Sequence, residues 1–405
     1  MRKNAVNRQL NKIDGGVCAV AGFTANTARC AFDADFLSDD VGFIFTDKKC
    51  AVAFLGDASP MCGAPVKVSR HHAGFGYARG ILFNNAVANA YGEGSEKLSK
   101  MMCWEVARKL RVDATSIIVA STGKIGKTFT LNDFVPCVPE LIKGLDFTQT
   151  QDEKLALALD AKHPKQLAFS FELGDFTCKI GAVFKGNTRV APNLATTLCF
   201  LTTDVNITPE MLQKALTSVV NDTFNQLCID CVSSPNDCIC MLANGKAGNY
   251  KISNDDNEYK KFVFALADVM DQICRALVAN ESVGERAFLC KVKGARSKKL
   301  ARDIAKSVIS AEGIKARLQK GEAQLGDFYG AIIRAGEMID ETKLTIALCN
   351  ENGRIVLMED GNPIPVVDAR VAETLQSNDI SVEIGLGNGN YTATGYGRIN
   401  NVNHS

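Results

Sequence analysis

Residues 185–198 read Lys-Gly-Asn-Thr-Arg-Val-Ala-Pro-Asn-Leu-Ala-Thr-Thr-Leu, a polar loop that runs directly into an apolar segment. A strand-like run ends just before this loop, at Phe184, and Pro192-Asn193 is a typical loop pair. A buried strand is predicted to begin at Thr196 or Thr197. The sheet behind a threonine at a strand start holds it in place, and its β-branch restricts the direction of its hydroxyl.

A threonine hydroxyl becomes a useful nucleophile when a proton acceptor lies beside it. A free α-amine is a suitable acceptor, because its pKa of about 7.7–8.0 lies close to working pH. Thr196 gains such an amine only if its hydroxyl attacks the Ala195 carbonyl and the resulting ester is hydrolysed. From this segment alone, a plain loop that enters a core strand is the simpler interpretation, and both interpretations stay open at this point.

The composition is typical of a globular protein rather than a disordered or membrane-spanning one. Apolar residues make up 46% of the 405 residues and charged residues 22%, with a net charge of +1, which gives no reason to expect nucleic-acid binding. No apolar run is long enough for a transmembrane helix. The 15 cysteines fall largely within apolar runs and no secretory signal precedes them, so they are predicted to be free and buried in a reducing, intracellular compartment.

Helices and strands alternate irregularly along the chain. Apolar periodicity predicts helices at 98–110, from Pro209 onward, at 259–278 and at 298–312. Short apolar runs predict strands at 115–120, 166–171, 177–184, 197–202, 287–292, 344–348, 354–358 and 380–384. This pattern favours a layered α/β or α+β architecture over a doubly wound parallel sheet.

The loop segment resembles the ornithine acetyltransferase (glutamate N-acetyltransferase) family, whose motif reads approximately K-G-S-G-M-I-x-P-N-M-A-T-M-L. The run from Pro192 to Thr196 matches this motif, and Lys185 stands at the family's lysine. Further stretches match family motifs in the right order along nearly the whole chain: Gly15-Gly16-Val17, Ala64-Pro65-Val66, residues 84–90, residues 121–126, Thr203-Asp204, Asn236-Asp237, residues 242–245 and residues 398–405.

The resemblance implies self-cleavage between Ala195 and Thr196, into chains 1–195 and 196–405, with Thr196 as the nucleophile. It implies an ornithine-acetyltransferase/DmpA-like fold with mixed sheets sandwiched with helices. It also implies that Thr122 and Gly123 supply the oxyanion hole, although a strand-exit turn is an alternative for this pair. The substrate contacts that the resemblance implies are Lys185, Thr196, Glu281, Asn400 and Ser405.

The implied activity is an acyl transfer of arginine biosynthesis, from N2-acetylornithine to glutamate through an acetyl-Thr196 ester. This chemistry needs no metal or bound cofactor, and acetyl-CoA is a second donor if the enzyme is of the bifunctional type. The family's assembly implies that the two cleavage fragments form a heterotetramer. We expect no membrane or nucleic-acid partner and a cytoplasmic location, with a mitochondrial one left open.

Two stretches depart from the family pattern. The family's T-T-D-T-x-P-K corresponds to residues 159–165, Leu-Asp-Ala-Lys-His-Pro-Lys, which lack the threonines, one of them an expected substrate contact. The family's D-G-E-G-A-T-K corresponds to residues 280–286, where Glu281 replaces the acidic contact to the ornithine amine, shifted by one position. These departures leave two alternatives open: a self-processing N-terminal-threonine amidohydrolase or aminopeptidase, and a non-catalytic degenerate homologue.

Other chemistry-bearing groups are interpreted as structural. Four cysteines have a spacing that is similar to that of zinc ligands. The last two lie in an apolar run that is typical of a core strand, so no metal site is predicted. His71-His72 is predicted to lie in a loop, and Trp104 to pack against the core. A G-x-G-x-G pattern at 385–389 precedes a strand rather than a helix, which argues against a dinucleotide site. The four cysteines are Cys228, Cys231, Cys238 and Cys240.

Overall fold

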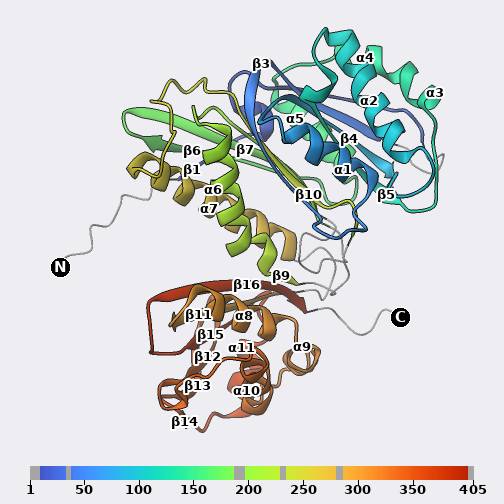
Figure 1. Cartoon of the computed structure of the whole chain (residues 1–405). Coiled ribbons are helices and arrows are strands. Elements are labelled where there is room, and N and C mark those ends of the chain that lie inside the picture. Colours follow the sequence, from blue (N-terminus) through green and yellow to red (C-terminus); the bar gives the residue numbers. More distant parts are fainter. Residues whose placement is uncertain (1–9, 33–37, 187–196, 229–233, 280–285, 400–405) are drawn as a thin grey trace. The chain divides into compact units, whose positions relative to one another are not determined.

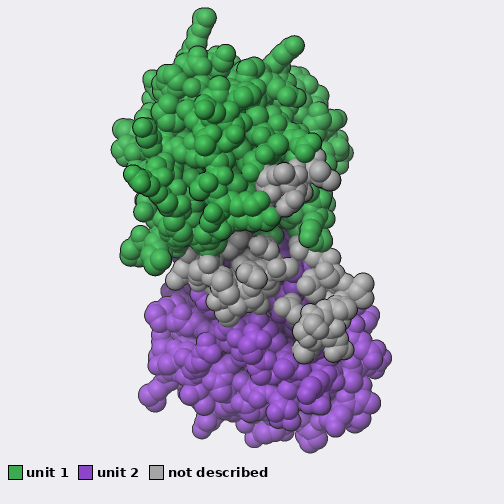
Figure 2. Space-filling view, turned by 90° about the vertical axis from the view of Figure 1, so that its right-hand side faces the viewer, with its two compact units in different colours: residues 1–187, 193–219, 233–269 green, residues 188–192, 220–232, 270–405 purple. Residues whose placement is uncertain are grey.

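The computed structural model describes residues 10–32, 38–186, 197–228, 234–279 and 286–399. The chain divides into two compact units (Figure 2). The first comprises residues 1–187, 193–219 and 233–269, and the second comprises residues 188–192, 220–232 and 270–405. Segments from both sides of the expected cleavage site therefore belong to the first unit.

The first unit is built on a mixed nine-stranded sheet (Figure 1). Its order is β1-β6-β7-β8-β10-β3-β4-β5, and β2 pairs with β3. The β4–β5 and β8–β10 pairs are parallel, and the other pairs are antiparallel. The strands are β1 (Asn11–Ile13), β2 (Thr24–Ala28), β3 (Val41–Gly56), β4 (Tyr77–Val87), β5 (Ile117–Lys124), β6 (Lys165–Leu173), β7 (Phe176–Gly186), β8 (Thr197–Thr203) and β10 (Cys238–Ala243).

Helices bury the two faces of this sheet in separate apolar clusters. Leu155 and Leu159 pack in one cluster with Phe83, and Met102 packs in the other with Leu82. Because successive strand residues point to opposite faces, the neighbours Leu82 and Phe83 show that both faces of β4 are covered. The helices are α1 (Ala64–Ala73), α2 (Ser95–Leu110), α3 (Leu131–Phe134), α4 (Val138–Lys143) and α5 (Gln149–Leu159), with 3₁₀ turns at Val17–Ala19, Ala114–Ser116 and Val135–Cys137.

Two further helices begin in the first unit and continue into the second. These are α6 (Pro209–Asp222) and α7 (Asn257–Val278). The α6 helix starts at the predicted proline, and the Thr208 hydroxyl caps it by accepting the Met211 N–H at 3.3 Å. The sequence prediction for this helix start is confirmed.

The second unit contains a mixed seven-stranded sheet of order β14-β13-β12-β15-β11-β16-β9. The apolar side chains of α8 pack on it, including Leu300, Ile304 and Val308. Its strands are β9 (Leu227–Cys228), β11 (Arg286–Ala295), β12 (Thr345–Asn350), β13 (Gly353–Glu359), β14 (Asn362–Pro363), β15 (Asp379–Gly385) and β16 (Tyr391–Ile399). Its helices are α8 (Lys298–Ile309), α9 (Glu312–Gln319), α10 (Leu325–Arg334) and α11 (Asp368–Thr374), with 3₁₀ turns at Phe224–Gln226 and Glu341–Lys343.

These two mixed sheets with packed helices confirm the predicted layered α/β class. Several element predictions need correction. The strand predicted at 115–120 begins only at Ile117, because residues 114–116 form a 3₁₀ turn. The helix predicted at 298–312 ends at Ile309, and Gly313 lies inside α9 rather than after a helix end. Trp104 is 45% exposed on α2 beneath the Arg108 guanidinium, so it does not pack in the core.

The cysteines confirm one sequence prediction and correct another. Twelve described cysteines lie outside any disulfide, and all of them except Cys349 are buried. Cys30 and Cys137, however, are joined in a disulfide with Cα atoms 5.7 Å apart. These two positions are separated by 107 residues, so only tertiary folding brings them together. Among the described residues, no helix is both long and apolar enough to cross a membrane.

Candidate active site

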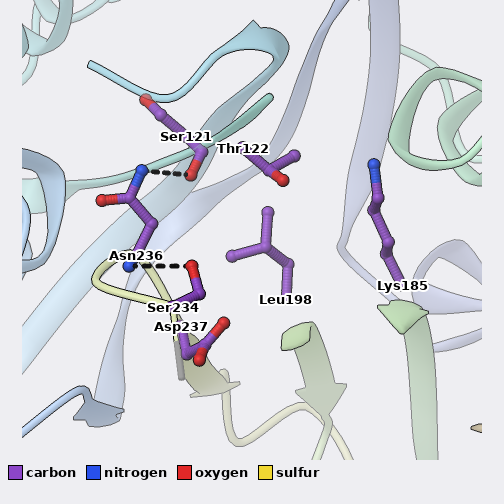
Figure 3. Close-up of a pocket in the computed structure, with 7 residues that line it drawn as sticks. All are labelled: Ser121, Thr122, Lys185, Leu198, Ser234, Asn236 and Asp237. Atoms are coloured by element: carbon purple, nitrogen blue, oxygen red, sulfur yellow. Dashed lines mark hydrogen bonds between the residues drawn. The ribbon is translucent and has the colours of Figure 1, made fainter. Parts of the chain in front are cut away.

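A small pocket opens in the first unit where β5, β7, β8 and the turn before β10 meet (Figure 3). Its empty volume is about 200 Å³ when the adjoining open solvent is counted with it. Thr122 and Lys185, two residues predicted to act on substrate, therefore share one pocket with the start of β8. The lining residues are Ser121, Thr122, Lys185, Leu198, Ser234, Asn236 and Asp237.

Strand pairing brings both ends of the 187–196 loop to this pocket. The β7 and β8 strands are antiparallel neighbours, with Gly186 opposite Thr197 and Lys185 opposite Leu198. The strand that was predicted to start at Thr196 or Thr197 is observed from Thr197. Five predicted site residues lie outside the described residues: Ala195, Thr196, Glu281, Asn400 and Ser405.

A buried hydrogen-bond network fixes the strand that carries Thr122. The Asn84 side-chain amide donates to the Ser121 hydroxyl at 2.8 Å. The Asn236 amide donates to the Ser121 carbonyl at 2.9 Å and to the Ala88 carbonyl at 2.5 Å. Because all these groups are buried, each lost bond leaves an unpaired polar group, which makes the arrangement rigid.

Thr122 and Gly123 lie inside β5, so the strand-exit turn considered for them is wrong. Thr122 lines the pocket and pairs with Asn85 of β4. Gly123 has φ +128°, and a Cβ there would stand 2.2 Å from the Ala86 carbonyl oxygen. Both the backbone conformation and this close approach require glycine. The assignment of these residues to an oxyanion hole stays a prediction.

Lys185 is held by a partner that the sequence did not reveal. Its ammonium group donates to the Asn85 side-chain oxygen at 2.6 Å, and the Asn85 amide donates to the Ala158 carbonyl at 3.0 Å. Burial lowers the pKa of Lys185, and the nearby Asp160 carboxylate partly opposes that shift. Lys185 is thus an oriented cation at the pocket rather than a solvated loop lysine.

Asp160 belongs to the stretch that departs from the family pattern. It follows α5, and one of its carboxylate oxygens accepts the backbone N–H groups of Lys162 and His163, each at 3.2 Å. The Asp160 charge acts on Lys185. The charge of this carboxylate thus reaches the pocket lysine from the stretch where the family pattern has threonines.

Comparison with known proteins identifies the family. The ArgJ family model matches residues 24–398. The chain belongs to the ArgJ family. It is 30% identical over 389 residues to the arginine biosynthesis bifunctional protein ArgJ of Oceanobacillus iheyensis, covering 95% of this chain and 93% of that protein. It is 29% identical to the glutamate N-acetyltransferase of Methanopyrus kandleri, covering 88% of this chain and 91% of that protein.

A solved ArgJ structure is also similar, that of the arginine biosynthesis bifunctional protein from Bacillus halodurans. It is 25% identical, covers 50% of this chain and 94% of that chain, and has a TM-score of 0.44. Membership of the ArgJ family confirms the predicted class of enzyme, an acetyltransferase of arginine biosynthesis.

The structure also shows where the histidine pair, the cysteines and the glycine run that were interpreted as structural lie. The prediction that His71-His72 lies in a loop is wrong, because both residues fall in the last turn of α1. The buried His72 ring bonds the Ile117 carbonyl at 2.7 Å, and burial lowers the pKa of His72. Cys238 and Cys240 are buried in β10 as predicted, whereas Cys231 is outside the described residues. The run at 385–389 leads into β16 as predicted.

We predict that Gly123→Ala is more damaging than Gly126→Ala, although both glycines have positive φ. A side chain at Gly126 meets nothing within 4 Å, so that change costs only the backbone strain, about 1–2 kcal/mol. Gly123→Ala adds a clash with Ala86, on the order of 1–3 kcal/mol more, and displaces Thr122. Urea unfolding and activity measure both effects, and equal losses for the two variants would contradict this assignment.

Proposed function

We propose that this ArgJ-family enzyme transfers an acetyl group from N2-acetylornithine to glutamate through an ester on Thr196. The observation that carries this proposal is the pocket lined by β5, β7 and β8, where Thr122 and the oriented Lys185 ammonium flank the start of β8. A nucleophile at residue 196 is covalently attached to Thr197, the first residue of that strand. The activities for which the two relatives are named support the same reaction.

Self-cleavage between Ala195 and Thr196 is compatible with the sheet. The cut falls in a connection between two neighbouring strands. The antiparallel pairing of Ile180–Gly186 with Thr197–Thr203 holds these two strands together. Chain 1–195 would keep β1 to β7, and chain 196–405 would supply β8 and β10 to the same sheet. The fragments would thus remain one folded unit, and we propose that pairs of them form the heterotetramer.

The proposed cycle transfers the acetyl group twice. The Thr196 amine takes the proton of its own hydroxyl as the oxygen attacks the acetyl carbonyl carbon. The carbon–nitrogen bond of N2-acetylornithine then breaks, and the ammonium proton passes to the leaving ornithine amine. The glutamate amine attacks the Thr196 ester in the same way, and the threonine hydroxyl is restored. Donors at Thr122 and Gly123 would stabilise the oxyanion of each tetrahedral intermediate.

Lys185 is proposed to bind a substrate carboxylate by a charge-assisted hydrogen bond. Its fixed position on Asn85 supports this role, since a flexible lysine would lose more entropy on binding. Further substrate contacts from Glu281, Asn400 and Ser405 are part of the proposal, with Glu281 binding the ornithine amine. Acetyl-CoA would enter the same pocket as a second donor if the enzyme is bifunctional.

The acetyl-enzyme is the direct test of this function. Purified protein incubated with N2-acetylornithine alone should show fragment 196–405 heavier by one acetyl group in intact-mass analysis. Added glutamate should remove the group and yield N-acetylglutamate, and Thr196→Ala should be neither cut nor acetylated. Loss of the acetyl group to water at the same rate without glutamate would instead indicate an amidohydrolase. An uncut, unmodified wild-type chain would indicate a non-catalytic homologue.

We predict that Asp160→Asn lowers the KM for glutamate, on the order of threefold to tenfold, and changes kcat little. The carboxylate of Asp160 competes with a substrate carboxylate for Lys185, and the amide removes that charge while keeping an oxygen for the Lys162 and His163 N–H groups. Steady-state kinetics at pH 7 measure the effect. Asp175→Asn, at an exposed turn, is the matched control. An unchanged KM in Asp160→Asn would exclude this competition.

A further inference from the structure

The β5 strand stands last in the order of the first-unit sheet, so one of its edges has no neighbour among the described strands. In a parallel ladder, alternate residues direct both their N–H and C=O groups to the same neighbour. The Ala88 N–H donates to the Lys124 carbonyl at 3.2 Å, so Lys124 and every second residue before it face β4. The intervening residues of β5 direct their backbone groups to the open edge: Ile117, Val119, Ser121 and Gly123.

Two side chains of α1 take the place of a neighbouring strand along the first part of this edge. The Ser69 hydroxyl accepts the Val119 N–H at 2.8 Å and donates to the Val119 carbonyl at 2.6 Å. The His72 ring bonds the Ile117 carbonyl at 2.7 Å. All of these groups belong to buried residues, so each backbone group of the edge would be costly to leave unpaired.

Asn236 continues this cover at the end of β5 that reaches the pocket. Its side-chain amide donates to the Ser121 carbonyl at 2.9 Å (Figure 3). The Gly63 N–H, directly before α1, donates to the Pro235 carbonyl at 2.7 Å and joins the helix to the turn that carries Asn236. We name the three side chains that cover the open edge the edge clamp: Ser69, His72 and Asn236.

The next outward group after the Ser121 carbonyl is the N–H of Gly123, one of the two proposed oxyanion donors. Such a donor must lie about 2.7–3.1 Å from the developing charge, and a misplacement of about 1 Å can cost roughly a hundredfold in rate. The ladder with β4 holds β5 from one side, and the edge clamp holds it from the other. Ser69 is not among the described residues that line the pocket, so it acts on this donor through β5.

We propose that Ser69 is a positioning residue of the acetyl transfer, which holds Val119 and thereby fixes the direction of the Gly123 N–H. This rests on the proposed function, in which Gly123 stabilises the oxyanion of each tetrahedral intermediate. The negative charge develops in the transition state, so an accurately placed donor stabilises that state more than the bound substrate. Loss of the Ser69 hydroxyl therefore slows the chemical step and leaves substrate binding nearly unchanged.

Ser69→Ala tests the proposal, with Ser99→Ala as a matched control. Both serines are 0% exposed, and the Ser99 hydroxyl also makes two hydrogen bonds, to the Ser95 carbonyl and from the Asn89 amide, neither of them in β5. The urea midpoints of the two variants should therefore fall alike. Ser69→Ala should lose about tenfold or more in kcat, with a KM within about twofold of wild type. Ser99→Ala should keep the wild-type kcat, and equal kcat values for the two variants would overturn the proposal.

A spectroscopic readout separates this role from a general loss of stability. In acetyl-enzyme made from N2-acetylornithine with an isotope label at the acetyl carbonyl, bonds from the oxyanion donors lower the C=O stretching frequency of the ester. Ser69→Ala should shift this band to higher frequency, and Ser99→Ala should leave it in place. The same band position in Ser69→Ala and wild type would overturn this inference alone. A wild-type chain that forms no acetyl-enzyme would overturn the proposed function.

A third measurement uses the wild-type protein and depends on neither a variant nor activity. Because the Ser69 hydroxyl accepts the Val119 N–H, amide hydrogen exchange at Val119 should be as slow as at Ile118 and Ala120, which face the ladder. An edge without the clamp would show fast exchange at Val119 between two slow neighbours. That alternation would overturn the proposal even where the proposed function holds.

Discussion

The antiparallel ladder between β7 and β8 is the constraint on which the site depends. It sets Gly186 opposite Thr197 and thereby brings both ends of the 187–196 connection to one point at the edge of the pocket. The same ladder sets Lys185 opposite Leu198, so the pocket lysine and the start of β8 have a fixed register. A shift of one residue would turn every side chain of β8 to the other face and separate these groups.

Buried amides hold the rest of the pocket against this ladder. Asn84 and Asn236 bond Ser121 from two sides, and Asn85 bonds Lys185. Such groups contribute modestly to net stability but are costly to break one at a time, which favours a single arrangement. That rigidity suits acyl transfer, where the nucleophile, its base and the oxyanion donors need accurate placement. Asn236 Oδ1 and Asp237 Oδ2, at the same pocket, are buried without a hydrogen-bond partner among the described residues.

Local patterns predicted the elements well where periodicity was strong. The α2 stripe of Met102 and Val106 is buried, and α6 begins at Pro209. Errors arose where local and tertiary preferences disagree. His71-His72 lies in the last turn of α1, which ends at Ala73 before Gly74, and the break between α8 and α9 falls at residues that are all compatible with helix.

The candidate site likewise contains residues that the sequence could place and residues that it could not. Lys185 and Thr122 could be placed through motif resemblance, and the pocket brings these two together. The links of Asn85 and Asp160 to Lys185 were beyond prediction, because they connect β4 and the turn after α5 with β7, segments that are distant in sequence. Asp237 was visible as part of a motif, but its burial and unpaired oxygen emerge only from the folded chain.

The central claim is that one backbone cut converts Thr196 into a chain start that carries its own base. N-terminal sequencing of the purified, active protein tests it most directly. The account predicts two sequences in equal amounts, one from the original start and one that begins Thr-Thr-Leu-Cys. A single sequence from the original start in fully active protein would contradict it.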